Sequence, residues 1–187
     1  MQYQLPGTTI EVRGYSRDVA DTVLENIFQC KGVVLSQVAV MTGVEPHDVQ
    51  NWVKRRFLPP PQHRQYTRRQ FTRVAVINML RETMQIDNIL RLLSYINGAL
   101  DDESDDSIDD CTLYNLFVNL LGSLGDRLPP EAELARHCDE ELSDFEEKIP
   151  DSRRRIKEVL MVMVYAYYSA RAKCKVDELM KDIKAAT

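Results

Sequence analysis

The segment from Val33 to Leu93 constrains the fold more than any other part of the chain, because its helical patterns are short and sharply interrupted. An apolar pattern from Ser36 to Thr42 ends at Gly43, and a second pattern begins at Pro46. Proline suits the first position of a helix, and glycine suits a turn residue with positive φ. Ser36 is expected to cap the first pattern. Two short helices joined by a tight turn are therefore predicted.

The second of these helices is predicted over residues 46–56 and is stopped by the prolines at 59–61. A short basic loop at 62–66 follows, and Thr67 is expected to cap the next helix. Two helices across a tight turn, followed by a short hairpin-like loop, are the parts of a winged helix-turn-helix in their usual order. Residues 62–66 would be the wing, and binding to duplex DNA is the leading hypothesis.

The rest of the chain is predicted to be helical, because apolar residues recur at helical spacing and alternating runs are scarce. Residues 1–15 are predicted to be a weakly structured leader, with a possible short strand from Thr8 to Val12. The fold class is mainly α, with an all-helical C-terminal bundle. We expect residues 1–98 to hold an N-terminal helix and the winged helix-turn-helix, 99–110 to be an acidic linker, and 111–187 to be a helical domain for dimerisation or sensing. Further helices are predicted at 16–30, 85–97, 111–124, 130–149 and 151–183.

The net charge of −5 hides a strong asymmetry between segments. Residues 31–98 carry ten Lys and Arg against four acids, a balance of +6, whereas residues 99–150 carry three against sixteen, a balance of −13. The basic segment coincides with the predicted DNA-binding unit. The acidic run 101–110 does not fit a calcium loop, because its sixth residue is Asp106 and its twelfth is Thr112, where such loops need Gly and Glu.

Candidate DNA contacts fall into two chemical groups. His47, Gln50, Asn51 and Lys54 lie at i, i+3, i+4 and i+7 of the predicted helix 46–56, so they share one face and can address base edges. The alternative is that the same face is an ordinary solvated helix surface that binds nothing. Arginines beside that helix, in the wing and after it suit phosphate. Tyr66 either contacts phosphate through its hydroxyl or packs the wing on Trp52. The full candidate set is Ser36, His47, Gln50, Asn51, Lys54, Arg55, Arg64, Tyr66, Arg68 and Arg69.

Catalysis, metal binding and cofactors are not expected. The sequence shows no paired nucleophile and base, phosphate loop or metal cluster, and its four cysteines are far apart. The N-terminus has no apolar signal segment. The longest apolar run, Val159–Tyr168, is much shorter than the roughly 20 residues of a membrane span. A soluble, cytoplasmic protein without a membrane partner is expected.

Several short motifs of residues 33–93 occur in a characteristic order and spacing: Leu35-Ser36-x-x-Ala39, Thr42-Gly43-Val44-x-Pro46, Trp52, Lys54-Arg55, Leu58-Pro59-Pro60, Tyr66-Thr67 and Met84-Gln85-Ile86-Asp87-x-Ile89. With these motifs the segment resembles the DNA-binding domain of the MerR family, which implies a winged helix-turn-helix that binds specific DNA sequences. Gln50 and Asn51 stand where MerR proteins have Arg and Tyr. MerR proteins also follow this domain with a long dimerising helix, whereas an acidic segment and a helical bundle follow here.

The whole chain is also similar to a family of small uncharacterised proteins of Gram-positive bacteria, known only as a domain of unknown function. Residues 97–106 and 110–115 carry that likeness, which implies no known activity.

Two functions follow as expectations. The first is a transcriptional regulator that binds double-stranded DNA as a homodimer, because one short reading helix seldom supplies enough affinity alone. Its C-terminal domain would dimerise or bind an effector of unknown identity. The alternative is a protein-interaction adaptor that keeps the helix-turn-helix fold without specific DNA binding.

Overall fold

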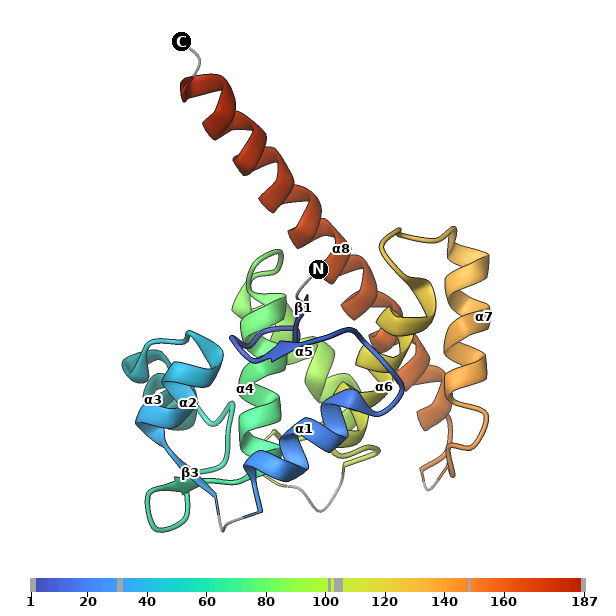
Figure 1. The fold of residues 1–187 in the computed structure, drawn as a ribbon. Coiled ribbons are helices and arrows are strands. Elements are labelled where there is room, and N and C mark those ends of the chain that lie inside the picture. Colours follow the sequence, from blue (N-terminus) through green and yellow to red (C-terminus); the bar gives the residue numbers. More distant parts are fainter. Residues whose placement is uncertain (1–2, 30–31, 101, 103–105, 148, 186–187) are drawn as a thin grey trace.

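The computed structural model describes residues 3–29, 32–100, 102, 106–147 and 149–185. Across these ranges the chain forms eight helices and two sheets of two strands, so the predicted mainly helical class is confirmed (Figure 1). Within the same ranges, no helix is both long enough and apolar enough to cross a membrane. The helices are α1 (Val19–Ile27), α2 (Leu35–Thr42), α3 (Pro46–Lys54), α4 (Arg68–Leu80), α5 (Ile86–Asn97), α6 (Asp110–Leu124), α7 (Glu131–Glu141) and α8 (Ser152–Ala185). The strands are β1 (Tyr3–Gln4), β2 (Glu11–Val12), β3 (Val33–Val34) and β4 (Gln65–Tyr66).

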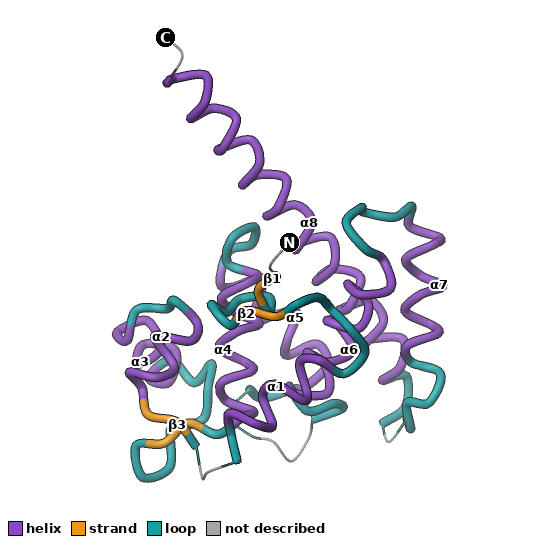
Figure 2. The backbone as a smooth tube through the Cα atoms, in the orientation of Figure 1, coloured by secondary structure: helices purple, strands orange, loops and turns teal. Residues whose placement is uncertain are grey.

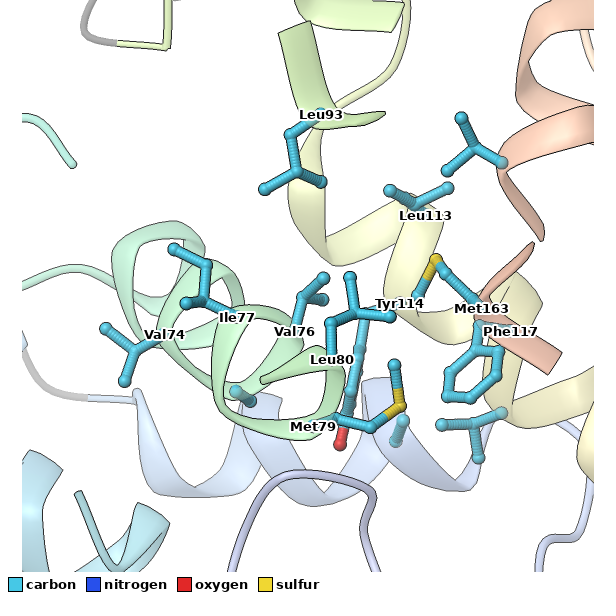
Figure 3. Packing of buried hydrophobic residues seen from close by; sticks show 14 of the residues in the cluster. Val74, Val76, Ile77, Met79, Leu80, Leu93, Leu113, Tyr114, Phe117 and Met163 are labelled. Carbon is cyan, nitrogen blue, oxygen red and sulfur yellow. The ribbon is translucent and has the colours of Figure 1, made fainter. Parts of the chain in front are cut away.

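Helix α4 forms the centre of the molecule. Ten of its thirteen residues are buried, which is typical of a helix covered on all sides. It packs against α2, α5, α6 and α8. Figure 3 shows Leu80 of α4 close to Tyr114 and Phe117 of α6, with Met163 of α8 beside them. Residues from both halves of the chain therefore build one hydrophobic core, which runs from Leu5 to Tyr168.

The N-terminal segment belongs to this core, so the prediction of a weakly structured leader was wrong. Strands β1 and β2 pair antiparallel, with Tyr3 opposite Val12, and Leu5 between them is fully buried. Gly7 has φ 71° and passes so close to α4 that a Cβ there would lie 1.9 Å from the Ala75 carbonyl oxygen. Burial of this kind depends on a distant helix, which no local pattern in the first fifteen residues reveals.

Several predicted helix boundaries are confirmed because they depend on local signals. The Thr67 hydroxyl accepts from the Gln70 amide at 3.2 Å, and the Gln70 side chain accepts from the Thr67 amide at 2.8 Å. This reciprocal pair satisfies two amides that the helix itself cannot. Gly43 ends α2 with φ 68°, and Pro46 opens α3.

Other boundaries differ from the predictions. Helix α1 begins at Val19 instead of after Ser16, because the Asp18 amide donates to Asn119 of α6 at 2.8 Å. Its predicted end at Cys30 lies outside the described residues, and the helix ends at Ile27. Helix α7 ends at Glu141, well before the predicted Ile149. Ser36 lies inside α2 rather than capping it, because the Gln37 side chain accepts from the Val34 amide at 2.9 Å.

The last residues of the acidic segment, 107–110, pack into the core ahead of α6 and at its start. Residues 101 and 103–105 lie outside the described part of the chain. Ser107, Ile108 and Asp110 are buried, and the Asn97 side chain donates to the Ile108 carbonyl at 2.8 Å. Asp109 caps α6. The core thus continues across the boundaries predicted at 98 and 111.

Helix α8 is 34 residues long and has two different environments. Its first half packs against α4, α5, α6 and α7. Its outer part projects beyond the other helices, as the smooth trace in Figure 2 also shows. Every residue from 172 to 184 is exposed. We call residues 172–184 the stem.

Candidate functional site

Helix α3 is held by its inward side, which leaves the predicted reading face open. Val49 and Trp52 of α3 are buried, as is Val38 of the neighbouring α2. The opposite side of α3 carries polar residues, because the two kinds of residue alternate at helical spacing. The four predicted readers His47, Gln50, Asn51 and Lys54 are all exposed there, as is the adjoining Arg55.

The predicted wing at 62–66 is a tight turn followed by β4. Strand β4 pairs antiparallel with β3, with Tyr66 opposite Val33. The Gln65 amide donates to the Gln62 carbonyl at 2.8 Å, and the two residues between them, His63 and Arg64, have φ 49° and 63°. Positive φ at both central residues is the geometry of a type I′ turn, which favours Asn and Gly. The turn therefore holds Arg64 exposed at its tip at a cost in backbone strain.

A hollow of about 520 Å³ lies between α2, α3 and the wing, and it brings together four of the ten candidate residues. Its polar lining comes from Ser36, Gln50 and Arg64. Tyr66 also lines it, although the residue is only 3% exposed and burial raises its pKa. The remaining lining residues are apolar: Val34, Leu35, Val53 and Pro61. We call this feature the α2–α3–wing hollow.

Arg68 and Arg69 lie apart from this hollow, at the end of α4 that faces α1 and α6. Arg68 forms an ion pair with Asp21 of α1. Arg69 pairs with Asp106, and its Nε lies 3.1 Å from Asp110 Oδ2. Their side chains are 25% and 20% exposed. Carboxylates therefore already balance the charge of both arginines.

Two further arginines were not identified from the sequence. Arg73 of α4 is 2% exposed and forms two 2.9 Å hydrogen bonds to the carboxylate of Asp110. Arg81 lies 5.8 Å from the ring of Trp52 and 3.2 Å from Asp48, so it supports α3 from the side. The spacing of Arg69 and Arg73 places them on one helix face, but only the fold shows which carboxylate meets them.

The basic residues behind the net charge of +6 in residues 31–98 therefore have two different environments in the folded chain. Arg68, Arg69 and Arg73 are engaged by acids from other elements. Lys54, Arg55 and Arg64 are exposed on α3 and the wing. The guanidinium of Arg55 also lies over the Phe57 ring at 4.6 Å, which restrains its position. The accessible basic surface is therefore concentrated around the α2–α3–wing hollow.

A second hollow, of about 570 Å³, lies between the residue Arg17 ahead of α1, the start of α6 with the segment before it, and the segment after α7. Arg17 and Glu141 form one ion pair at its wall, with 3.3 Å between nitrogen and oxygen. The Ser107 hydroxyl, which also lines it, is buried without a hydrogen-bond partner among the described residues. Residues from both halves of the chain therefore line this hollow.

Together the described elements define a mainly helical protein with an exposed polar helix face beside a short basic turn. The family described as "Domain of unknown function (DUF1836)" matches residues 20–117, more than half of the 187 residues, and the chain belongs to this family. The matched range runs from α1 into α6, so it contains both the α2–α3–wing hollow and the contact between Arg73 and Asp110. No curated protein and no solved structure matches the chain.

Proposed function

We propose that residues 33–93 form a winged helix-turn-helix and that the protein is a sequence-specific regulator of transcription that binds double-stranded DNA. The observation that carries this proposal is the α2–α3–wing hollow. Residues chosen for DNA chemistry come from three separate elements, and they surround one surface feature. Helix α3 would enter the major groove, with the wing turn over the adjacent backbone.

Each candidate residue has a role that suits its position. The amides of Gln50 and Asn51 can pair with an adenine edge, while His47 and Lys54 extend the same face. Arg55 and Arg64 would contact phosphates on either side of the groove. Ser36, in the first turn of α2, would donate to a phosphate. Tyr66 would hold the wing in place from its buried position.

Arg68 and Arg69 would contribute less to phosphate binding than Arg55 and Arg64. Their ion pairs with Asp21, Asp106 and Asp110 would have to open before a phosphate could take the place of the carboxylates. Their main contribution would be to hold α4 against α1 and α6. Two copies of the chain, each reading one half-site, would supply the affinity that one short helix lacks.

The adaptor alternative is supported by one feature of the same hollow. Four of its eight lining residues, Val34, Leu35, Val53 and Pro61, are apolar, and Val34 is 41% exposed. An apolar floor with a polar rim also suits a side chain of a bound peptide. In that case the basic rim would select acidic peptides instead of phosphates.

Selection of bound sequences from a random DNA pool tests the main proposal. We expect one enriched motif, with affinity for it falling steeply as salt rises. Asn51→Ala and Gln50→Ala should blur the motif, whereas Arg55→Ala and Arg64→Ala should weaken binding to every sequence. Arg91→Ala is a matched control, because Arg91 is an exposed arginine of α5 away from the hollow. A pool without enrichment, together with unchanged binding by all four variants, would contradict DNA reading and favour the adaptor.

A further inference from the structure

The stem of α8 lacks the packing that a helix of its length needs. All thirteen residues from 172 to 184 are exposed, and the helix projects into solvent over this range (Figure 1). Isolated helices below about 12–15 residues are marginal in water even with favourable sequences. Val176, Leu179 and Ile183 are nevertheless 57%, 51% and 59% exposed. Apolar side chains at these positions require a partner surface to be stabilising.

The exposed apolar residues of α8 follow a heptad repeat. Val162, Tyr165, Val176, Leu179 and Ile183 are five of the six large apolar residues exposed within the described part of this helix. Along the helix these residues are spaced alternately by three and by four positions. Ser169 and Ala172 occupy the two positions of this repeat between Tyr165 and Val176. This spacing is the seam of a two-stranded coiled coil. The part of this series that lies on the stem, from Ala172 to Ile183, points to a second helix of that length as its partner.

We infer that the stem pairs with the stem of a second copy of this chain in an antiparallel coiled coil. The charges beside the seam determine the orientation. When Val176 lies opposite the partner's Leu179, Lys175 lies opposite the partner's Asp182, and two-fold symmetry repeats this pair. A parallel arrangement would instead place Lys175 opposite the partner's Met180 and leave the carboxylate of Asp182 without a basic residue across the seam.

Two local features agree with the antiparallel register. Lys175 pairs with Glu178 of its own helix at 3.0 Å, and both side chains are more than half exposed, so the lysine can also meet a second carboxylate. At the foot of the stem, Leu128, Tyr165, Ser169 and Ala172 line a hollow of about 660 Å³. In this register the partner's Ile183 lies opposite Ala172, so the end of the partner's helix reaches that hollow.

The inference supplies the second half of the proposed DNA-reading unit, but its evidence is independent of DNA. Its test is therefore the molar mass of the full chain in DNA-free solution, by sedimentation equilibrium. We expect a species of twice 21.6 kDa. Leu179→Glu should weaken dimerisation by about a hundredfold, since it places two charges in the seam. Lys181→Glu, on the outward face, is the control and should leave it unchanged. Because Leu179 and Lys181 are both exposed, circular dichroism should show both variants folded.

A charge exchange tests the orientation. Lys175→Asp alone and Asp182→Lys alone should each weaken dimerisation about tenfold, because each places like charges across the seam. The double variant should return to within about threefold of the wild type, which only the antiparallel register explains. A monomeric wild type at about 100 μM, an unaffected Leu179→Glu dimer, or a double variant without recovery would overturn the inference. Because the molar mass is measured without DNA, failure of this inference and failure of the proposed DNA binding are distinguishable.

Discussion

Arg73 and Asp110 face each other inside the core and form two hydrogen bonds, Nε to Oδ1 and Nη2 to Oδ2, each 2.9 Å long. Their side chains are 2% and 3% exposed. The remaining Arg73 nitrogen donates to the Leu100 carbonyl. Arg73 belongs to α4 and Asp110 opens α6, so one buried pair connects the segment that carries α3 to the helices that follow.

Breaking this pair should destabilise the protein strongly. Arg73→Met or Asp110→Asn leaves one partner buried without its counter-charge, and we expect each to lower the free energy of unfolding by about 3–5 kcal/mol. The double variant Arg73→Met/Asp110→Asn should lose much less than the sum of the two, because neither member of the buried pair keeps an unmatched charge and Arg69 retains Asp106 as its partner. Urea unfolding followed by circular dichroism measures all three. Additive losses would show that the two residues act independently.

A fragment of residues 1–98 should not fold by itself. It keeps Arg73 but lacks Asp110 and the α6 residues Leu113, Tyr114 and Phe117, which cover α4. Exposed apolar surface and a lone buried cation both oppose folding. We expect poor chemical-shift dispersion in its NMR spectrum. A fragment of residues 1–171, which loses only the exposed stem, is the matched control and should retain native dispersion.

Substitution of His63 and Arg64 by residues that adopt positive φ with little strain should stabilise the wing turn. His63→Asn/Arg64→Gly fits the type I′ turn and should stabilise the protein by about 1 kcal/mol, because neither residue is then strained at positive φ. Loss of the Arg64 guanidinium should weaken DNA binding in the same variant. His63→Asn alone keeps that charge and should gain part of the stability without the loss in affinity. Thermal unfolding and a DNA titration separate the two effects, and a lower melting temperature in both variants would count against the turn assignment.

Acid should weaken the cap of α6. Burial acts to raise the pKa of Asp109, but hydrogen bonds from the Thr112 hydroxyl and the Thr112 and Cys111 amides outweigh it, so this pKa lies below the usual 3.8. A depressed pKa in the folded state means that the stabilisation is fully present above about pH 3.8 and is lost as pH falls through the folded value.

Asp109→Asn tests this cap. Asparagine also accepts from the helix amides but does not titrate over this range, so the variant should lose less stability between pH 7 and pH 3. Asp109→Ala, which removes the cap, should be less stable than the wild type at pH 7. If Asp109→Asn loses as much stability between pH 7 and pH 3 as the wild type does, carboxylates other than Asp109 are responsible for the loss.

Sequence patterns predicted the parts of this fold that depend on neighbouring residues. The turn at Gly43, the Thr67 cap and the exposed face of α3 follow from local rules of backbone conformation, hydrogen bonding and helical spacing. The start of α1 and the burial of Leu5 did not follow, because both depend on contacts across the fold. Asp18, for example, bonds to a residue 101 positions away.

The candidate site shows the same division. Exposure of Gln50 and Asn51 was predictable from their spacing against Val49 and Trp52. The ion pairs of Arg68 and Arg69 were not, because Asp21 and Asp110 are 47 and 41 residues distant. A count of charges in a segment cannot distinguish an arginine in solution from one held by a carboxylate.

The Asn78 side chain links the N-terminal hairpin to the end of α2. Its amide group donates to the Gly7 carbonyl at 2.9 Å and to the Thr42 carbonyl at 2.8 Å, at the end of α2. The Thr9 amide also donates to the Met41 carbonyl at 2.8 Å. Residues 7–9 therefore connect the end of α2 to α4 and help to fix the orientation of α2 relative to α4. A change that breaks these hydrogen bonds would therefore allow α2, and α3 after it, to move relative to α4, although no residue on the polar face of α3 takes part in them.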